Sequence, residues 1–178
     1  QLMVFKELQL PLMVLKMTEL ELIKLAEKAI LKLKERNKTL ALAESCTGGW
    51  LSKIITDVSG ASAVYRGGIC SYSNEVKMKV LGVKEETLNT FGAVSEQVAV
   101  QMAEGARKTL NSDIGIGITG IAGPLSDNTA KPVGLIYVAI SNENKTLCTE
   151  LRNNFTEDIR LQNRFSAVKT ALNLLGDI

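Results

Sequence analysis

Two side chains capable of nucleophilic attack, Ser45 and Cys46, are adjacent in the run 43–50, which reads A-E-S-C-T-G-G-W. The carboxylate of Glu44 stands directly before them. This run follows a short apolar segment, 40–43, and precedes apolar residues spaced like one face of a helix. A strand, a glycine turn and a helix start would gather free backbone N–H groups and the positive helix end at one point. The run therefore predicts an oxyanion-binding turn that contains a nucleophile.

A simpler interpretation of this turn is that one of its side chains only caps the following helix. Serine and threonine before a helix usually accept a hydrogen bond from its first N–H groups. Both Ser45 and Thr47 stand in a suitable position. The two interpretations stay open together, because a capping residue can also be a nucleophile.

The chain contains no histidine. This absence excludes a Ser-His-Asp triad, a Cys-His pair and histidine-ligated metal sites within the chain. The three cysteines, Cys46, Cys70 and Cys148, are too far apart for a zinc motif or a disulfide framework, which favours a reducing cytosol. Any proton transfer must therefore fall to a lysine, a carboxylate or a tyrosine, and we expect no metal and no cofactor.

Lys77 is the residue best suited to act as this base. The pattern predicts a short helix that begins at Ser73 or Asn74 and carries Lys77 in its first turn, where the helix end disfavours a further positive charge. This field, together with desolvation, lowers the pKa of a lysine from about 10.4. A neutral lysine can accept the proton of a serine. The plain alternative is an exposed surface lysine.

Tyr72 and Cys46 are further candidates near the same point. Tyr72 ends a predicted strand, so its hydroxyl could reach the pocket, or the residue could be an ordinary half-buried strand tyrosine. Cys46 would depend on the helix end alone to form a thiolate, and buried inert cysteines are common. A cysteine hydrolase that uses Cys46 remains an alternative to a serine hydrolase that uses Ser45.

Composition limits the kinds of protein this chain can be. With 178 residues, of which 46% are hydrophobic, we expect one globular domain. The net charge of +2 and the aromatic content of 4% give no reason to expect a nucleic-acid surface. Residues 1–17 are apolar but interrupted by charges and a proline, so they resemble neither a membrane span nor a signal peptide. We expect an N-terminal extension of unknown role over 1–17, a single domain over 18–178, a cytoplasmic location and no membrane partner.

Periodicity and turn signals divide the chain into alternating helices and strands. A capping box formed by Thr18 and Glu21 predicts a helix from Thr18 to about residue 36. The predicted strands are 40–43, 63–72, 114–119, 135–140 and 147–151, and the glycines of 114–119 permit close backbone approach. The further predicted helices are 50–58, 74–79, 84–90, one capped by Ser95 that runs to 110, and one capped by Thr156 that runs to 175.

This alternation predicts an α/β sandwich whose sheet is covered by helices on both faces. Ligands gather at the carboxyl ends of strands in such sheets. The turns 45–49, 72–74 and 119–124 all fall there, and 120–134 is a long loop of the kind that often serves function. Together they predict a pocket rich in backbone N–H groups, suited to a phosphate or an oxyanion.

Five motifs in this order give the chain a specific resemblance. They are A-E-S-C-T-G-G-W (43–50), Y-S-N-E-V-K (72–77), G-A-V-S-E (92–96), T-G-I-A-G-P (119–124) and K-P-V-G (131–134). Over roughly residues 18–175 the chain resembles the CinA C-terminal domain family, the bacterial nicotinamide mononucleotide amidohydrolases. Many members also carry an N-terminal molybdopterin-binding-like domain, and this chain resembles the stand-alone form.

The resemblance implies a fold and an activity. The fold is a three-layer α/β/α sandwich with a mixed, mostly parallel sheet. The activity is hydrolysis of nicotinamide mononucleotide to nicotinic acid mononucleotide and ammonia, without a metal, in pyridine nucleotide salvage. Ser45 and Lys77 match the family's catalytic pair, and Tyr72 matches its nearby tyrosine. A homodimer or higher homo-oligomer is expected, and the alternative function is a catalytically weak module that binds nucleotide or a competence-related partner.

Substrate contacts are expected around the three turns. Backbone N–H groups of Thr47, Gly48 and Gly49 would hold the oxyanion, and N–H donors or cations would hold the phosphate. The other expected contacts are Glu44, Arg66, Asn74, Thr119, Gly120, Ala122, Gly123 and Arg160. Glu44 could hold a ribose hydroxyl or orient Lys77, and the alternative is a structural hydrogen bond. The chain departs from its relatives at 125–130, where they commonly have a glycine pair, and at 158–160, where they tend to have G-D-R.

Overall fold

The computed structural model describes the backbone of residues 2–177 and the side chains of residues 18–177. Its helices are α1 (Leu2–Glu35), α2 (Trp50–Thr56), α3 (Asn74–Leu81), α4 (Glu85–Phe91), α5 (Glu96–Thr109) and α6 (Ile159–Gly176), with a 3-10 turn at Ala61–Ala63. Its strands are β1 (Leu40–Glu44), β2 (Tyr65–Cys70), β3 (Ile114–Gly120), β4 (Leu135–Ser141) and β5 (Thr146–Arg152).

The five strands form one sheet in the order β2-β1-β3-β4-β5. β1 pairs in parallel with β2 and β3, whereas β4 is antiparallel to both β3 and β5. Four strands therefore run in one direction and only β4 opposes them. The expected mixed, mostly parallel sheet is confirmed.

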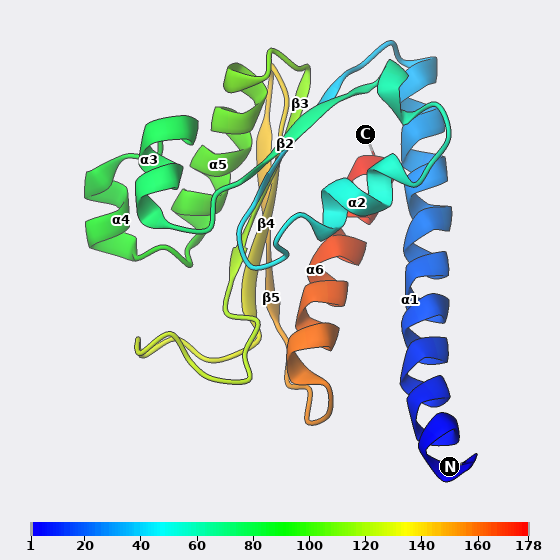
Figure 1. Cartoon of the computed structure of the whole chain (residues 1–178). Coiled ribbons are helices and arrows are strands. Elements are labelled where there is room, and N and C mark those ends of the chain that lie inside the picture. Colours follow the sequence, from blue (N-terminus) through cyan, green and yellow to red (C-terminus); the bar gives the residue numbers. More distant parts are fainter. Residues whose placement is uncertain (1, 178) are drawn as a thin grey trace.

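Helices cover both faces of this sheet. α1, α2 and α6 lie on one side, and α3, α4 and α5 lie on the other (Figure 1). Side chains of β1 alternate between the two faces of the sheet. Leu40 and Leu42 pack on the side of α1, α2 and α6, and Ala41 and Ala43 pack on the side of α3, α4 and α5. Because β1 is buried on both faces, it is a continuous apolar run rather than an alternating one. The predicted three-layer sandwich is confirmed.

Several predicted element ends are wrong. α1 begins at Leu2, so the capping-box pattern at Thr18 lies inside a helix; a local cap signal does not stop a helix whose preceding residues also favour helix. α6 begins at Ile159, and its N-cap position is Asp158 rather than Thr156. The second strand is shorter than predicted, because a 3-10 turn takes its start and Tyr72 lies beyond its end.

The two serine caps are confirmed. The hydroxyl of Ser73 accepts from the Val76 N–H at 3.2 Å, and that of Ser95 accepts from the Val98 N–H at 3.3 Å. These bonds set the starts of α3 and α5. Among the described helices, none is both long enough and apolar enough to cross a membrane. No group of three or more His, Cys, Asp or Glu residues placed to hold a metal ion occurs within residues 18–177.

Glycines in β3 let α5 approach the sheet closely. A Cβ atom on Gly115 would lie 2.0 Å from the Ala103 carbonyl oxygen, and one on Gly117 would lie 2.3 Å from that of Ala99. Since both contacts are with helix backbone, a side chain could be accommodated only by moving α5. The expectation that these glycines permit close backbone approach is confirmed.

We predict that Gly117→Ala lowers the free energy of unfolding by about 2–3 kcal/mol, because the added methyl forces α5 away from the sheet. Urea denaturation measures this loss. Gly176→Ala is the matched control, since nothing lies within 4 Å of a Cβ at that position. A Gly117→Ala protein as stable as the wild type would contradict the close packing of α5 on β3.

Candidate active site

The turn after β1 holds Ser45 at the carboxyl edge of the sheet. The Ser45 N–H donates to the Ile118 carbonyl at 3.0 Å, which extends the pairing of β1 with β3 by one residue. The Gly48 N–H donates back to the Ser45 carbonyl at 3.0 Å. Gly48 and Gly49 have φ values of 60° and 90°, which glycine adopts without strain. The predicted order of strand, glycine turn and helix is therefore confirmed.

Glu44 caps α2 across this turn. One carboxylate oxygen accepts from the Leu51 N–H at 3.1 Å, and the other accepts from the Ser52 N–H at 2.8 Å and the Ser52 hydroxyl at 2.6 Å. An ionised carboxylate is a stronger acceptor than a hydroxyl at the positive end of a helix. The predicted cap by Ser45 or Thr47 is thus wrong. Glu44 is buried and its carboxylate is fully engaged, so it positions the turn instead of contacting a substrate.

Lys77 lies directly behind Ser45. Its Nζ is 3.1 Å from Ser45 Oγ, 2.7 Å from the Ser71 carbonyl oxygen and 3.4 Å from the Tyr72 carbonyl oxygen. Its exposed fraction is 1%, and it forms no ion pair with any carboxylate in the described part of the chain. The alternative of an exposed surface lysine is wrong.

Burial controls the protonation of the groups around Ser45. It lowers the pKa of Lys77 from its ordinary value, because the ammonium form loses hydration; the neighbouring Cys46 and Cys70, when ionised, oppose this shift. Burial also raises the pKa of the Cys46 thiol to about 12. A lysine that favours the neutral form thus stands beside a serine, while the adjacent cysteine stays a protonated, poorly nucleophilic thiol.

The contacts of Lys77 suit a neutral amine. A neutral amine has two hydrogens and one lone pair, and two carbonyl oxygens, those of Ser71 and Tyr72, lie within hydrogen-bond distance. When these carbonyls accept the two hydrogens, the lone pair is left for the Ser45 hydroxyl. After proton transfer, the ammonium can donate its third hydrogen to Ser45 Oγ. The same three contacts therefore accommodate Lys77 before and after it takes a proton.

Ser45 lines a hollow of about 270 Å³ at the carboxyl ends of β1 and β3. The hydroxyl of Tyr72 accepts from Arg160 at 3.3 Å, and the same guanidinium donates to the Gly123 carbonyl at 3.0 Å. Tyr72 is 64% exposed, so the alternative of a half-buried strand tyrosine is wrong. The residues that line the hollow are Ser45, Cys46, Tyr72, Gly120, Ile121, Ala122, Gly123, Leu125, Ser126, Asp127 and Arg160.

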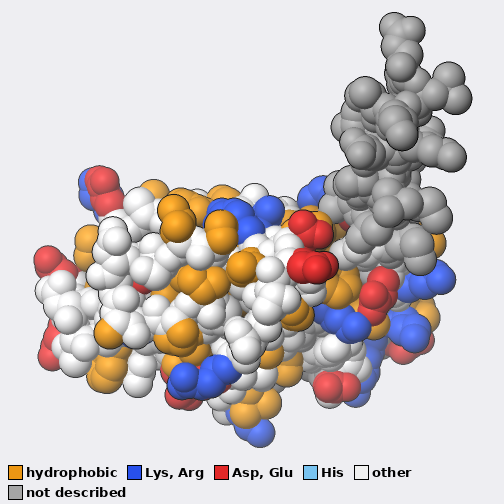
Figure 2. All heavy atoms as spheres, turned by 90° about the horizontal axis from the view of Figure 1, so that it is seen from below, with side chains coloured by type: hydrophobic (Ala, Val, Ile, Leu, Met, Phe, Trp, Pro, Cys, Tyr) orange, Lys and Arg blue, Asp and Glu red, His pale blue; other side chains and the backbone are white. Residues whose placement is uncertain are grey.

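Two further hollows lie nearby, and arginines of α6 are shared between the linings of neighbouring hollows. Arg160 also lines a hollow of about 510 Å³, and Arg164 lines both that hollow and a third of about 340 Å³. Arg164 donates to the Thr47 carbonyl at 2.7 Å and lies 5.3 Å over the Trp50 ring. Figure 2 views this edge of the molecule, where Lys and Arg side chains lie among hydrophobic ones rather than in one continuous patch.

The structure brings some of the expected substrate contacts together and separates others. Tyr72, Gly120, Ala122, Gly123 and Arg160 line the hollow of Ser45. Gly48 and Gly49 line the adjoining hollow of Arg164 instead. These glycines are therefore near Ser45, but they do not line the hollow in which it lies.

Four expected contacts are placed elsewhere. Arg66 is near the start of β2, beside the beginning of β1, because parallel strands bring only their carboxyl ends to the hollow. Thr119 is buried and its hydroxyl donates to the Ala93 carbonyl at 2.8 Å. Thr47 is fully buried. Asn74 begins α3 and is exposed, but it does not line the hollow.

Sequence reasoning missed residues that support the hollow from α6. Asn163 is buried, donates to the Ala122 carbonyl at 3.1 Å and accepts from Asn153 at 3.1 Å, which holds the wall of the hollow in place. Arg160, Asn163 and Arg164 follow the i, i+3, i+4 spacing of one helical face. That spacing of polar residues in a helix with an otherwise apolar inner face was the available signal.

The buried lysine makes stability depend on pH. Its pKa is lower in the folded protein than in the unfolded chain, so between these two values the unfolded chain binds more protons. The free energy of unfolding therefore rises with pH over that range, up to about pH 10.4. We predict that Lys77→Met flattens this rise. Urea denaturation at several pH values measures the slope.

Lys79→Met is the matched control for this measurement. Lys79 is on the same helix, but its side chain is 74% exposed and pairs with Glu75 at 2.6 Å. Replacing it should leave the pH dependence of stability as in the wild type. An unchanged slope in Lys77→Met would show that Lys77 is not the group whose proton affinity changes on folding.

Comparison with known proteins identifies relatives of this chain. A family model described as the CinA C-terminal domain matches residues 22–178. A CinA-like protein of Thermotoga neapolitana is 45% identical over 151 residues, which are 85% of this chain and 36% of that protein. The chain spans about a third of the length of the curated relatives it matches.

Solved structures agree with this match. The competence/damage inducible protein CihA from Agrobacterium tumefaciens superimposes with a TM-score of 0.81 at 39% identity, covering 86% of this chain and 93% of that one. A CinA superfamily protein from Escherichia coli superimposes with a TM-score of 0.83 at 30% identity, covering 88% and 90%. The chain belongs to the CinA C-terminal domain family.

Proposed function

We propose that this domain is an amidohydrolase that converts nicotinamide mononucleotide and water to nicotinic acid mononucleotide and ammonia. The observation that carries the proposal is the 3.1 Å contact between Ser45 Oγ and the buried Nζ of Lys77. The choice of substrate rests on the motifs at 43–50, 72–77 and 119–124, which resemble those of the bacterial nicotinamide mononucleotide amidohydrolases.

In the proposed mechanism, neutral Lys77 accepts the proton of the Ser45 hydroxyl as Oγ attacks the carboxamide carbon. The resulting ammonium donates that proton to the amide nitrogen when the C–N bond breaks, and ammonia leaves. A water molecule then attacks the acyl ester, with Lys77 again as the base, and Ser45 is regenerated. No other proton carrier is required.

Backbone N–H groups are available for the oxyanion. The N–H groups of Thr47 and Gly49 donate to no other part of the chain that the structure describes, whereas that of Gly48 is already bonded to the Ser45 carbonyl. Neither residue lines the hollow of Ser45, but both belong to the same turn, so Thr47 and Gly49 remain the proposed oxyanion donors and Gly48 does not. Donors fixed in advance toward developing negative charge are worth roughly 10²–10³ in rate.

Arg160 is the proposed contact for the substrate phosphate. Its guanidinium lies where the hollow of Ser45 meets the hollow of about 510 Å³, so the nicotinamide ring and the phosphate could occupy one each. Both of the hydrogen bonds that it forms within residues 18–177 are to neutral groups, the Gly123 carbonyl and the Tyr72 hydroxyl. The positive charge is therefore free to pair with an anion, which guanidinium groups bind well.

Removal of the nucleophile gives the most direct test. We predict that purified wild-type protein releases ammonia from nicotinamide mononucleotide and that Ser45→Ala lowers this rate by about 10³-fold or more. A coupled ammonia assay measures both rates. Ser45→Ala should still bind the nucleotide in calorimetry, because Arg160 and the walls of the hollow remain.

Cys46→Ala is the matched control, since Cys46 is adjacent, buried and lines the same hollow. It should keep most of the wild-type rate. Loss of activity in Cys46→Ala with retention in Ser45→Ala would favour a cysteine hydrolase instead. Nucleotide binding by the wild type without ammonia release would favour a binding module of the same fold.

The pH dependence of the rate tests the base. Only neutral Lys77 can accept the serine proton, so kcat/KM should rise with pH through the lowered pKa of Lys77 and then level off. Steady-state rates between about pH 6 and pH 10 define this limb. The chain has no histidine that could produce the same limb. A rate that falls with rising pH over this range would rule out Lys77 as the base.

A further inference from the structure

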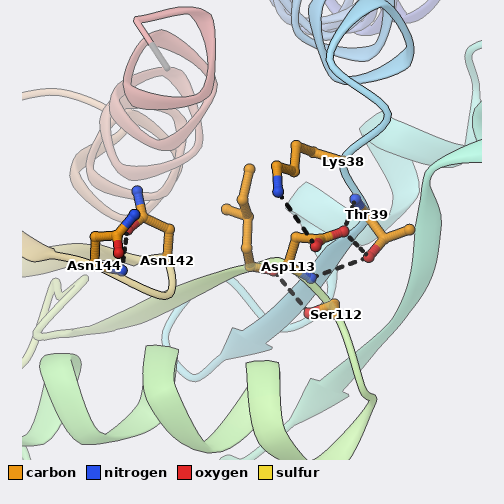
Figure 3. A network of polar contacts seen from close by, with 7 residues as sticks. Lys38, Thr39, Ser112, Asp113, Asn142 and Asn144 are labelled. Atoms are coloured by element: carbon orange, nitrogen blue, oxygen red, sulfur yellow. Dashed lines mark hydrogen bonds and ion pairs between the residues drawn. The ribbon is translucent and has the colours of Figure 1, made fainter.

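A second polar hollow, of about 310 Å³, lies at the opposite edge of the sheet from Ser45. It is found where β1 and β3 begin and beside the turn that joins β4 to β5, and Figure 3 shows several of its residues. Its lining residues are Arg36, Lys38, Arg107, Ser112, Asp113, Ile114, Asn142, Glu143 and Asn144. None of these has a role in the proposed hydrolysis.

Two arginines in this hollow have no partner for their charge. The side chains of Arg36 and Arg107 form no hydrogen bond and no ion pair with any residue in the described range. The Nε atom of Arg107 is buried in this state. A buried donor without a partner is costly, and buried charges are normally paired. The buried, unpaired Nε of Arg107, together with the unpaired guanidinium of the exposed Arg36 at the same hollow, therefore favours an anionic ligand.

The carboxylate in the hollow does not neutralise these arginines. One oxygen of Asp113 accepts from both the N–H and the hydroxyl of Thr39 at 2.8 Å, and the other lies 3.6 Å from Lys38 Nζ. Figure 3 shows Lys38 and Thr39 directed toward Asp113. Asp113 thus has its own partners, and Glu143, the remaining carboxylate, is exposed on the β4–β5 turn.

We propose that this hollow binds the phosphate group of a small molecule, held between the guanidinium groups of Arg36 and Arg107. Two guanidinium groups match the double negative charge of a phosphate, and each can donate two parallel hydrogen bonds to its oxygens. Asn142 and Asn144, whose turn is closed by the Asn142 side chain through bonds of 2.9 Å from the Asn144 and Lys145 N–H groups, form the facing wall.

This site is separate from the hollow of Ser45. Ile114, the first residue of β3, lines the one hollow, and Gly120, its last residue, lines the other. A strand of that length places them about 20 Å apart. Phosphate binding at Arg36 and Arg107 can therefore be measured whether or not the domain hydrolyses nicotinamide mononucleotide.

The test is a ¹⁵N NMR titration of the whole chain with inorganic phosphate and, separately, with adenosine monophosphate, at constant ionic strength. Saturable shifts of the amide signals of residues 112–114 and 142–144 are expected. Tighter binding of the nucleotide would identify a phosphate ester as the ligand, and tighter binding of inorganic phosphate would identify the free ion. Signals near Ser45 and Arg160 report separately on the other hollow.

Arg36→Gln and Arg107→Gln should each weaken this binding by about tenfold or more, because each removes charge-assisted hydrogen bonds. Arg36 is exposed, so its replacement does not endanger folding. Lys108→Gln is the control: Lys108 is an exposed cation on α5 that does not line the hollow, and its loss should change affinity less than twofold. Absence of saturable shifts in the wild type at millimolar phosphate, or equal affinity in Arg36→Gln, would overturn the proposal.

Discussion

The burial of Lys77 without a carboxylate partner is the constraint on which the site depends. A buried ammonium must lose its proton or gain an anion, and here the available neighbours are carbonyl oxygens, a hydroxyl and protonated thiols. The backbone carbonyls of Ser71 and Tyr72 fix the amine without favouring its charge as strongly as a carboxylate would. In the proposed hydrolysis, Lys77 can therefore take the role of base that histidine has in a Ser-His-Asp triad.

The sheet brings this lysine and the serine together from distant parts of the chain. Ser45 follows the end of β1, and Ser71 and Tyr72, whose carbonyls contact Lys77, follow the end of β2. Both ends lie at the same edge of the sheet, since the two strands are parallel. The Ser73 cap then starts α3 so that Lys77 turns back toward Ser45. α5, which packs closely on the glycines of β3, lies on the same face of the sheet as α3 and contacts it. Each of these residues is thus positioned by the end of a strand or the start of a helix.

Sequence reasoning located the pair but not its supports. Ser45 and Lys77 could be predicted because both follow local signals, a glycine turn and a capped helix start. Glu44 could not be recognised as a cap, since its bonds to Leu51 and Ser52 depend on how the turn folds back. Arg66 lies away from the site because the direction of β2 places it at the opposite edge of the sheet, which its residue type does not reveal. The spacing of Arg164 on one face of α6 is visible in the sequence, but its contact with the Thr47 carbonyl depends on how α6 packs beside α2.

The cap formed by Glu44 also affects the electrostatic surroundings of Lys77. Its carboxylate is the nearest acidic group to Ser45 in sequence, and a free carboxylate there would stabilise the ammonium form of Lys77. By binding the N–H groups that begin α2, the carboxylate directs its charge into the positive end of a helix. Glu44 therefore forms no ion pair with Lys77, although its charge still helps to raise the pKa of the neighbouring Cys46 and Cys70 thiols. A partly folded chain, in which Lys77 is hydrated and apart from Ser45, would lack the pair on which the proposed hydrolysis depends.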